Sequence, residues 1–140
     1  MVLIDGKKVS AEVRACLAKE VGELKEKTGR VPGLATVLVG DDPASAVYVR
    51  NKNKICRELG FKSFEQKLSL DTSEAKLLQL IKELNSNNDI HGILVQLPLP
   101  NQIDSEKILQ AIDPNKDVDG FHPVNAVSYT HLTLPTNREV

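Results

Sequence analysis

The sequence has few cysteines, almost no net charge and no long apolar segment. Its 140 residues include only two cysteines, Cys16 and Cys56, which form neither a redox pair nor a cluster with metal-ligand spacing. Both lie in segments with helical spacing, and we expect them to be buried free thiols. The formal net charge is -1, so no overall field favours nucleic acid or an anionic membrane as a partner.

The apolar runs are short. The longest, near residues 34–39 and 93–99, are well below the roughly 20 residues that a membrane-spanning helix needs. The first residues lack the basic region and apolar segment of a secretory signal. We therefore expect a cytoplasmic protein with no membrane partner. A length of 140 residues suits one domain with its own core.

Helical and strand patterns alternate along the chain. Apolar spacing predicts a helix from Ser10, as its N-cap, to Gly29, and another from the turn "DDPAS" to Gly60. A third helix is expected after Thr72 or Ser73, and a short fourth over "DSEKILQAI". "LATVLVG" and "IHGILVQLPLP" are typical of buried strands, whereas "FKSFEQKLS" suits a sheet edge. The pattern predicts an α/β fold, a three-layer sandwich with helices covering both faces of a mostly parallel sheet.

Residues 46–61 place a lysine on the predicted buried face of a helix. That face consists of residues three or four apart, namely Tyr48, Lys52, Ile55 and Leu59. The residues expected on the solvated face are Arg50, Asn53, Lys54, Arg57 and Glu58. Lys52 can extend its charged end to water past its apolar neighbours, or it can be held partly out of water as an acid/base group. One lysine does not decide between these interpretations.

Two further polar segments follow predicted elements. Gln96 and two prolines end the second apolar strand, where ligands collect in open α/β sheets, although prolines also simply end strands. The segment "KDVDGFHPVN" contains Asp117, Asp119 and His122. Its aspartates can form an Asx-type turn by accepting local backbone amides. His122 has no neighbours at metal-ligand spacing, so we expect no metal site and assign this histidine no role.

Three separated motifs occur together and in order. They are Ser45, Tyr48 and Lys52 in "SAVYVRNKNK", Gln96 in "GILVQLPLP" and Asp119 in "DVDGFHPVN". This combination resembles the N-terminal domain of the bifunctional methylenetetrahydrofolate dehydrogenase/methenyltetrahydrofolate cyclohydrolase family, from the N-terminus to about Asn125. The resemblance implies a folate-binding catalytic domain over residues 1–125. It also implies oxidation of 5,10-methylenetetrahydrofolate with NADP and hydrolysis of the methenyl product to 10-formyltetrahydrofolate, a one-carbon donor for purine biosynthesis.

The resemblance implies roles for individual residues. Tyr48 would stack on the pterin or aminobenzoyl part of the folate, and Lys52 would be the acid/base group at the one-carbon bridge. Gln96 would hydrogen-bond the lysine and fix its direction, and Asp119 would anchor the pterin ring. These four form the implied catalytic set. The implied substrate-binding residues are Tyr48, Lys52, Val95, Gln96, Leu97, Pro98 and Asp119.

The sequence departs from the family after residue 125. Family members continue into a Rossmann-like domain that binds NADP, but no G-x-G-x-x-G turn follows Asn125 here. We therefore expect no cofactor-binding residue in this chain, no dehydrogenase activity from it alone, and at most weak hydrolysis. The parent protein is expected to be a homodimer. Loss of the second domain should leave apolar residues near Leu97, Leu99 and Phe121 uncovered.

Residues 126–140 have another possible origin. The run from Val127 to Thr136, Val-Ser-Tyr-Thr-His-Leu-Thr-Leu-Pro-Thr, resembles the translation of a transposase sequencing adapter. We therefore expect residues 126–140 to be a non-native tail produced by adapter read-through. The alternative is a genuine C-terminal strand, because "VSYTHLTL" alternates in polarity. Genomic DNA that runs through this position without adapter bases would contradict the read-through hypothesis.

Two other functional readings remain open. The chain could be a non-catalytic folate-binding or subunit-interaction module. A solvated Lys52 without contact to Gln96 would favour that reading. The chain could also belong to another α/β enzyme class whose substrate domain precedes its cofactor domain, as in amino-acid or shikimate dehydrogenases. That class does not account for "VQLPLP" and "DVDGFHP" together.

Overall fold

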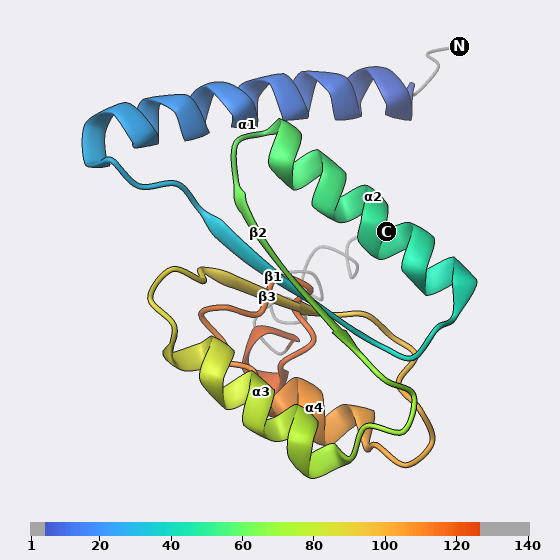
Figure 1. The fold of residues 1–140 in the computed structure, drawn as a ribbon. Coiled ribbons are helices and arrows are strands. Elements are labelled where there is room, and N and C mark those ends of the chain that lie inside the picture. Colours follow the sequence, from blue (N-terminus) through green and yellow to red (C-terminus); the bar gives the residue numbers. More distant parts are fainter. Residues whose placement is uncertain (1–4, 127–140) are drawn as a thin grey trace, which may run out of the picture.

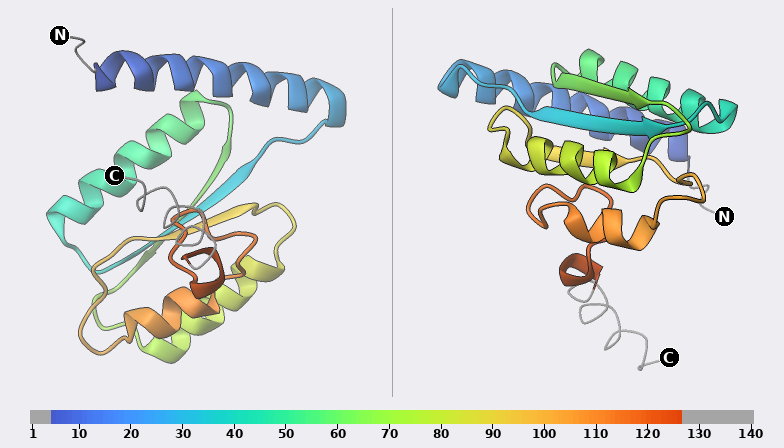
Figure 2. Two further views of the ribbon diagram at one scale, coloured as in Figure 1. Left: turned by 180° about the vertical axis from the view of Figure 1, so that it is seen from behind. Right: turned by 60° about the horizontal axis from the view of Figure 1, so that its bottom comes forward.

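The computed structural model describes residues 5–126. Its elements are α1 (Gly6–Thr28), β1 (Gly33–Val39), α2 (Pro43–Glu58), β2 (Lys62–Leu68), α3 (Glu74–Ser86), β3 (Gly92–Val95) and α4 (Ser105–Ala111). The strands form a parallel sheet in the order β2-β1-β3. α2 lies on one face of the sheet, and α1 crosses the end of α2. α3 and α4 lie on the other face of the sheet (Figures 1 and 2). This arrangement confirms the predicted α/β fold.

The apolar core lies between the sheet and the pair α3 and α4. Alternate residues of β1 point into it, because side chains alternate between the two faces of a strand. The buried members of this cluster are Ala35, Val37, Val39, Leu77, Ile81, Leu84, Ile90, Ile93, Val95, Ile103, Ile108 and Ile112. The polar strand β2 is an edge strand, as predicted, and only its Phe64 and Leu68 pack against the cluster.

The first helix begins earlier than predicted. Asp5, rather than Ser10, is the N-cap, and its side chain accepts hydrogen bonds from the backbone N–H groups of Lys7 and Lys8 at 3.0 and 3.1 Å. Gly29 ends the helix as predicted, in the left-handed conformation with φ 68°. No helix within residues 5–126 is long and apolar enough to cross a membrane.

The apolar face of α1 is mostly uncovered. Val21 is the buried residue of this helix, whereas the exposed fractions of Val9 and Val13 are 51% and 52%. The prediction of a buried Cys16 is wrong, because this thiol lies on the exposed surface of α1, 3.4 Å from Glu20 Oε1. The hydrogen bond to Glu20 and the charge of this carboxylate raise the pKa of the Cys16 thiol. Cys56 is a half-buried free thiol.

The predicted buried face of α2 is also wrong. The residues of α2 that are buried against the sheet are Ser45, Val49 and Asn53, one position away from the predicted face. Tyr48 is 63% exposed and Lys52 is half-buried. The helix is therefore turned so that Tyr48 and Lys52 lie on its flank, which leaves them accessible to a ligand.

Glycine is required at the start of β1, where the chain passes close to the loop before β3. A Cβ atom on Gly33 would overlap the backbone carbonyl of Asp89, whereas a Cβ atom on Gly22 in α1 meets no atom within 4 Å. We expect Gly33→Ala to lower the free energy of unfolding by about 1–3 kcal/mol, because backbone must move to accommodate it. Gly22→Ala should raise it by about 0.5–1 kcal/mol through helix propensity. Urea unfolding followed by circular dichroism measures both, and equal effects would contradict this account.

Candidate functional site

α2 begins just after the carboxyl end of β1. Asp42 caps the helix by accepting a hydrogen bond from the backbone N–H of Ser45 at 2.7 Å, and Pro43 occupies its first turn. This bond holds the pKa of the Asp42 carboxyl below its ordinary value. The first turns of α2 therefore start beside the carboxyl ends of the strands, where ligands of parallel sheets bind. The exposed Tyr48 lies one helical turn before Lys52.

Lys52 contacts Gln96, at the end of β3. The distance from Lys52 Nζ to Gln96 Oε1 is 3.5 Å. Gln96 is held by its own backbone, whose N–H donates to the carbonyl of Val37 at 2.9 Å. Its side-chain Nε2 donates to the carbonyl of Leu97 at 2.8 Å, so Oε1 is left facing the lysine. A neutral amide can orient an amine in this way without the charge of a carboxylate.

The apolar residues around Gln96 and in the later loop differ in how far they are exposed to solvent. The Leu97–Pro98 peptide bond is cis, with Leu97 half-buried and Pro98 exposed. The side chain of Val95 is buried in the core, which leaves only its backbone for a ligand. Phe121, one of the residues expected to be uncovered, is 53% exposed. Leu99 instead packs against the core cluster.

The loop after α4 runs along the outer edge of β3. The backbone N–H of Ile93 donates to the carbonyl of Lys116 at 2.7 Å, and Ile93 forms an isolated parallel bridge with Asp117. The Lys116 ammonium donates to the carbonyls of Asn85 and Asn87 at 2.7 and 2.9 Å. A cation at the last carbonyls of α3 is favourable, because these carbonyls carry the negative end of the helix dipole. Lys116 thus fixes one end of the loop to the fold.

The two aspartates of this loop have different environments. Asp117 accepts hydrogen bonds from the backbone N–H groups of Gly120 and His122 at 3.1 and 2.9 Å, and from Asn125 Nδ2 at 3.0 Å. Burial raises the pKa of Asp117, but these hydrogen bonds outweigh it and hold the pKa below its ordinary value. Asp119 is exposed and accepts no hydrogen bond from the described residues. The Asx-type turn is therefore formed by Asp117, which leaves the carboxylate of Asp119 free for a ligand.

Among the predicted site residues, contact is present between Lys52 and Gln96. Tyr48 lies beside Lys52 on the same helix, and Asp119 lies on the loop that follows the neighbouring edge of β3. His122 contributes to the loop: its Nδ1 accepts a hydrogen bond from the backbone N–H of Val124 at 3.3 Å. The described residues contain no group of three His, Cys, Asp or Glu side chains that could hold a metal ion.

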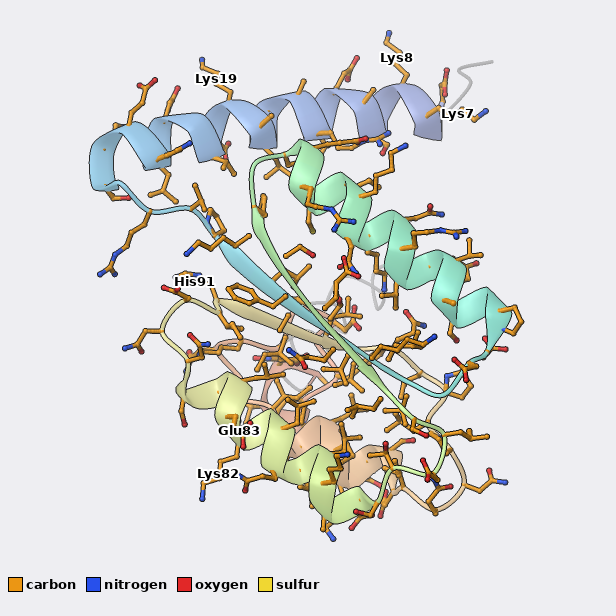
Figure 3. The ribbon with its side chains drawn as sticks, viewed as in Figure 1. Lys7, Lys8, Lys19, Lys82, Glu83 and His91 are labelled. Atoms are coloured by element: carbon orange, nitrogen blue, oxygen red, sulfur yellow. The ribbon has the colours of Figure 1, made fainter. Side chains whose placement is uncertain are left out.

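A hollow lies at the opposite end of the sheet. It has a volume of about 500 Å³ and is lined by Leu24, Thr28, Arg30, Val31, Pro32 and His91. His91 lies just before β3 begins (Figure 3), where its Nδ1 accepts a hydrogen bond from the backbone N–H of Gly33 at 3.0 Å. The lining is mainly apolar and lies beyond the amino ends of the strands. It offers no acid/base pair comparable to Lys52 and Gln96.

Sequence reasoning missed one structural feature of the site. Asn53, which was expected on the solvated face of α2, is fully buried and bonded to the sheet. The available signal was its spacing: Ser45, Val49 and Asn53 are four residues apart and so share one face of the helix. Two of these three residues are polar, so apolar spacing alone did not identify this face as buried.

The chain is similar to folate enzymes along most of its length. Residues 4–119 match the family model for the tetrahydrofolate dehydrogenase/cyclohydrolase catalytic domain. The bifunctional protein FolD 2 of Geobacter metallireducens is 62% identical over 123 residues, covering 88% of this chain and 43% of that protein.

Solved structures show the same similarity. The bifunctional FolD methylenetetrahydrofolate dehydrogenase/cyclohydrolase of Campylobacter jejuni superposes with a TM-score of 0.89 at 48% identity, covering 96% of this chain and 47% of that one. The FolD enzyme of Trypanosoma brucei, complexed with NADP cofactor and inhibitor, gives 0.88 at 38% identity over 91% of this chain and 43% of that one. The chain thus spans less than half the length of these relatives. It belongs to the tetrahydrofolate dehydrogenase/cyclohydrolase family, in the region of the catalytic domain.

Proposed function

We propose that this chain is the folate-binding catalytic region of a bifunctional methylenetetrahydrofolate dehydrogenase/methenyltetrahydrofolate cyclohydrolase of one-carbon metabolism. The observation that carries the proposal is the half-buried Lys52, whose Nζ lies 3.5 Å from Gln96 Oε1 beyond the carboxyl end of β3. The family match over residues 4–119 supports the same function. The parent protein is proposed to work in the cytoplasm as a homodimer, without nucleic acid or a membrane as partner.

Each residue of the site has a proposed task. The exposed ring of Tyr48 stacks on the pterin or aminobenzoyl part of the folate. The free carboxylate of Asp119 accepts the ring N–H and amino group of the pterin. The half-buried Leu97 and exposed Pro98 contact the substrate, while Val95 contributes through its backbone. Gln96 keeps the amine of Lys52 directed at the one-carbon bridge.

The hydrolysis is an addition of water to the methenyl carbon followed by cleavage of the bond between that carbon and N5. Lys52 accepts a proton from water as its oxygen adds to this carbon, and a proton is returned to N5 as the bond from the carbon to N5 breaks. The added hydroxyl loses its proton as it becomes the formyl carbonyl, so the products are 10-formyltetrahydrofolate and one released proton. Only the uncharged amine of Lys52 has a lone pair that can accept this proton.

The oxidation that precedes hydrolysis needs NADP. None of the eight glycines of the sequence forms a G-x-G-x-x-G turn, so the residues present do not fit the pyrophosphate of a dinucleotide. We therefore assign NADP to the part of the parent protein outside this chain and derive no step through it. The chain itself is expected to lack dehydrogenase activity.

The alternative, a folate-binding module without turnover, predicts a solvated Lys52 free of Gln96. The half-buried lysine in contact with the amide supports the enzyme instead. The test is hydrolysis of 5,10-methenyltetrahydrofolate by the 140-residue chain, followed by its absorbance, with the spontaneous rate subtracted. Hydrolysis that increases in proportion to protein concentration is expected. Folate binding without any acceleration would favour the module.

A further inference from the structure

The face of α2 that packs on the sheet is unusually polar. Its buried residues are Ser45, Val49 and Asn53, so Val49 is the one apolar side chain of α2 that is buried. The large apolar cluster lies on the opposite face of the sheet, against α3 and α4. Apolar packing tolerates small shifts, whereas hydrogen bonds depend strongly on distance and direction. The position of α2 therefore depends in part on its polar contacts.

Asn53 provides the buried polar contacts of α2 with the sheet, in addition to the exposed ion pair between Arg57 and Glu65 at 3.0 Å. Its side chain is fully buried, and its Oδ1 accepts hydrogen bonds from Thr36 Oγ1 at 3.0 Å and from Ser63 Oγ at 3.1 Å. Thr36 belongs to β1 and Ser63 to β2. One amide thus connects α2 to two neighbouring strands, which fixes both the rotation of the helix and its position along the sheet.

Burial of the Asn53 amide also lowers the stability of the fold. Asn53 Nδ2 is buried and has no hydrogen-bond partner among the described residues, and an unpaired buried donor destabilises a fold. A leucine at this position, with valine in place of Thr36, would avoid that cost at similar volume. Stability alone therefore does not account for an asparagine here.

The neighbour of Asn53 in sequence is Lys52. Successive residues of a helix are about 100° apart, so anchoring Asn53 to the sheet sets the direction in which Lys52 leaves the helix. The contact between Lys52 Nζ and Gln96 Oε1 is 3.5 Å long, at the upper limit of a hydrogen bond. A rotation or slide of α2 by a few tenths of an ångström is enough to lose it.

We propose that Asn53 is a positioning residue, which acts through Thr36 and Ser63 to hold α2 where Lys52 meets Gln96. Its importance for catalysis rests on the proposed function of Lys52, but the positioning itself can be measured without turnover. Asn53 contacts no substrate in this proposal.

The test compares side-chain amide NMR signals of Gln96 in the ¹⁵N-labelled 140-residue chain. Gln96→Ala assigns the signal by its loss, and Lys52→Met gives its position without the lysine contact. In the double variant Thr36→Val/Asn53→Leu, we expect the thermal unfolding midpoint to be maintained or raised. The Gln96 signal should move at least half of the way to its position in Lys52→Met. A smaller movement in the folded double variant would overturn the proposal.

Controls separate positioning from general effects. Asn51→Leu makes the same change at an exposed position of α2, and an equal shift there would overturn the proposal. If the double variant does not fold, Ser63→Ala removes one of the two hydrogen bonds. It should cause a smaller shift in the same direction, and no shift would count against Asn53. A Gln96 signal that is the same in the wild type and in Lys52→Met would also overturn the proposal.

Hydrolysis of 5,10-methenyltetrahydrofolate distinguishes this proposal from the proposed function. We expect the double variant to lower the Lys52-dependent rate, defined as the difference between wild type and Lys52→Met, about tenfold, mainly in kcat. If the wild type and Lys52→Met hydrolyse equally, the proposed function fails while the NMR result still decides the role of Asn53. If only Lys52→Met reduces the rate, Asn53 is not a positioning residue.

Discussion

Replacement of Lys52 by methionine is expected to lower hydrolysis of 5,10-methenyltetrahydrofolate by the chain at least about a hundredfold, after the spontaneous rate is subtracted. Methionine keeps the length and apolar stem of lysine but removes the amine that transfers the proton, and general acid/base catalysis contributes about 10²–10⁴-fold. Lys52 is half-buried, and within residues 5–126 it is the lysine whose ammonium contacts Gln96.

The matched control is Lys54→Met. Lys54 lies on the same helix, is exposed, and forms a surface ion pair with Glu58 at 3.8 Å. Surface pairs of this kind contribute little to stability, about 0–1 kcal/mol, so this variant should hydrolyse the substrate at the wild-type rate. Equal losses in the two variants would show that the effect is one of overall charge, and no loss in Lys52→Met would contradict the assigned acid/base role.

Replacement of Asp117 by alanine is expected to loosen the loop that carries Asp119. The substitution removes the acceptor of three hydrogen bonds, from Gly120, His122 and Asn125. We expect the free energy of unfolding to fall by about 1–3 kcal/mol, because bonds to a charged group are stronger than neutral ones. Folate should bind more weakly as well. Chemical unfolding and a folate titration measure the two effects.

This effect should depend on pH with a definite sign. The pKa of Asp117 is lower in the folded chain than its ordinary value of 3.8. A lowered pKa gives stability that is present above the unfolded value and is lost as the pH falls through the folded one. The difference in stability between wild type and Asp117→Ala should therefore be constant near neutral pH and shrink below about pH 4. A difference that grows on acidification would contradict the role of Asp117.

Much of the fold could be predicted from the sequence because its strongest signals are local. The continuous apolar run of β1, the edge character of β2 and the capping by Ser73 and Gly29 all match the structure. The start of α1 was wrong because Asp5 and Ser10 are both good N-caps. The choice between these two N-caps depends on how far α1 extends beyond the residues that pack against the rest of the protein.

The rotation of α2 could not be predicted from apolar spacing. Tyr48, Ile55 and Leu59 suggested one buried face, but the helix packs through Ser45, Val49 and Asn53. Asn53 is compatible with burial only because Thr36 and Ser63 are placed to donate hydrogen bonds to it. Those partners come from two strands, so their positions depend on the tertiary structure.

Only part of the candidate site could be predicted from the sequence. The contact between Lys52 and Gln96 follows from the parallel sheet, because the carboxyl end of β3 meets the flank of α2. The different environments of Asp117 and Asp119 depend on which oxygen meets which loop amide, and the sequence pattern does not carry this information. The predicted adapter-derived tail over residues 126–140 lies, beyond Ala126, outside the described residues and stays a prediction.

The most direct test of the central claim is to locate bound folate on the chain. We would titrate the ¹⁵N-labelled 140-residue chain with tetrahydrofolate in the absence of oxygen and follow its backbone amide signals. The account predicts that the largest shifts occur at Tyr48, Lys52, Gln96 and Asp119, at the carboxyl end of the sheet. Shifts confined to the hollow lined by Val31 and His91 at the opposite end would contradict it.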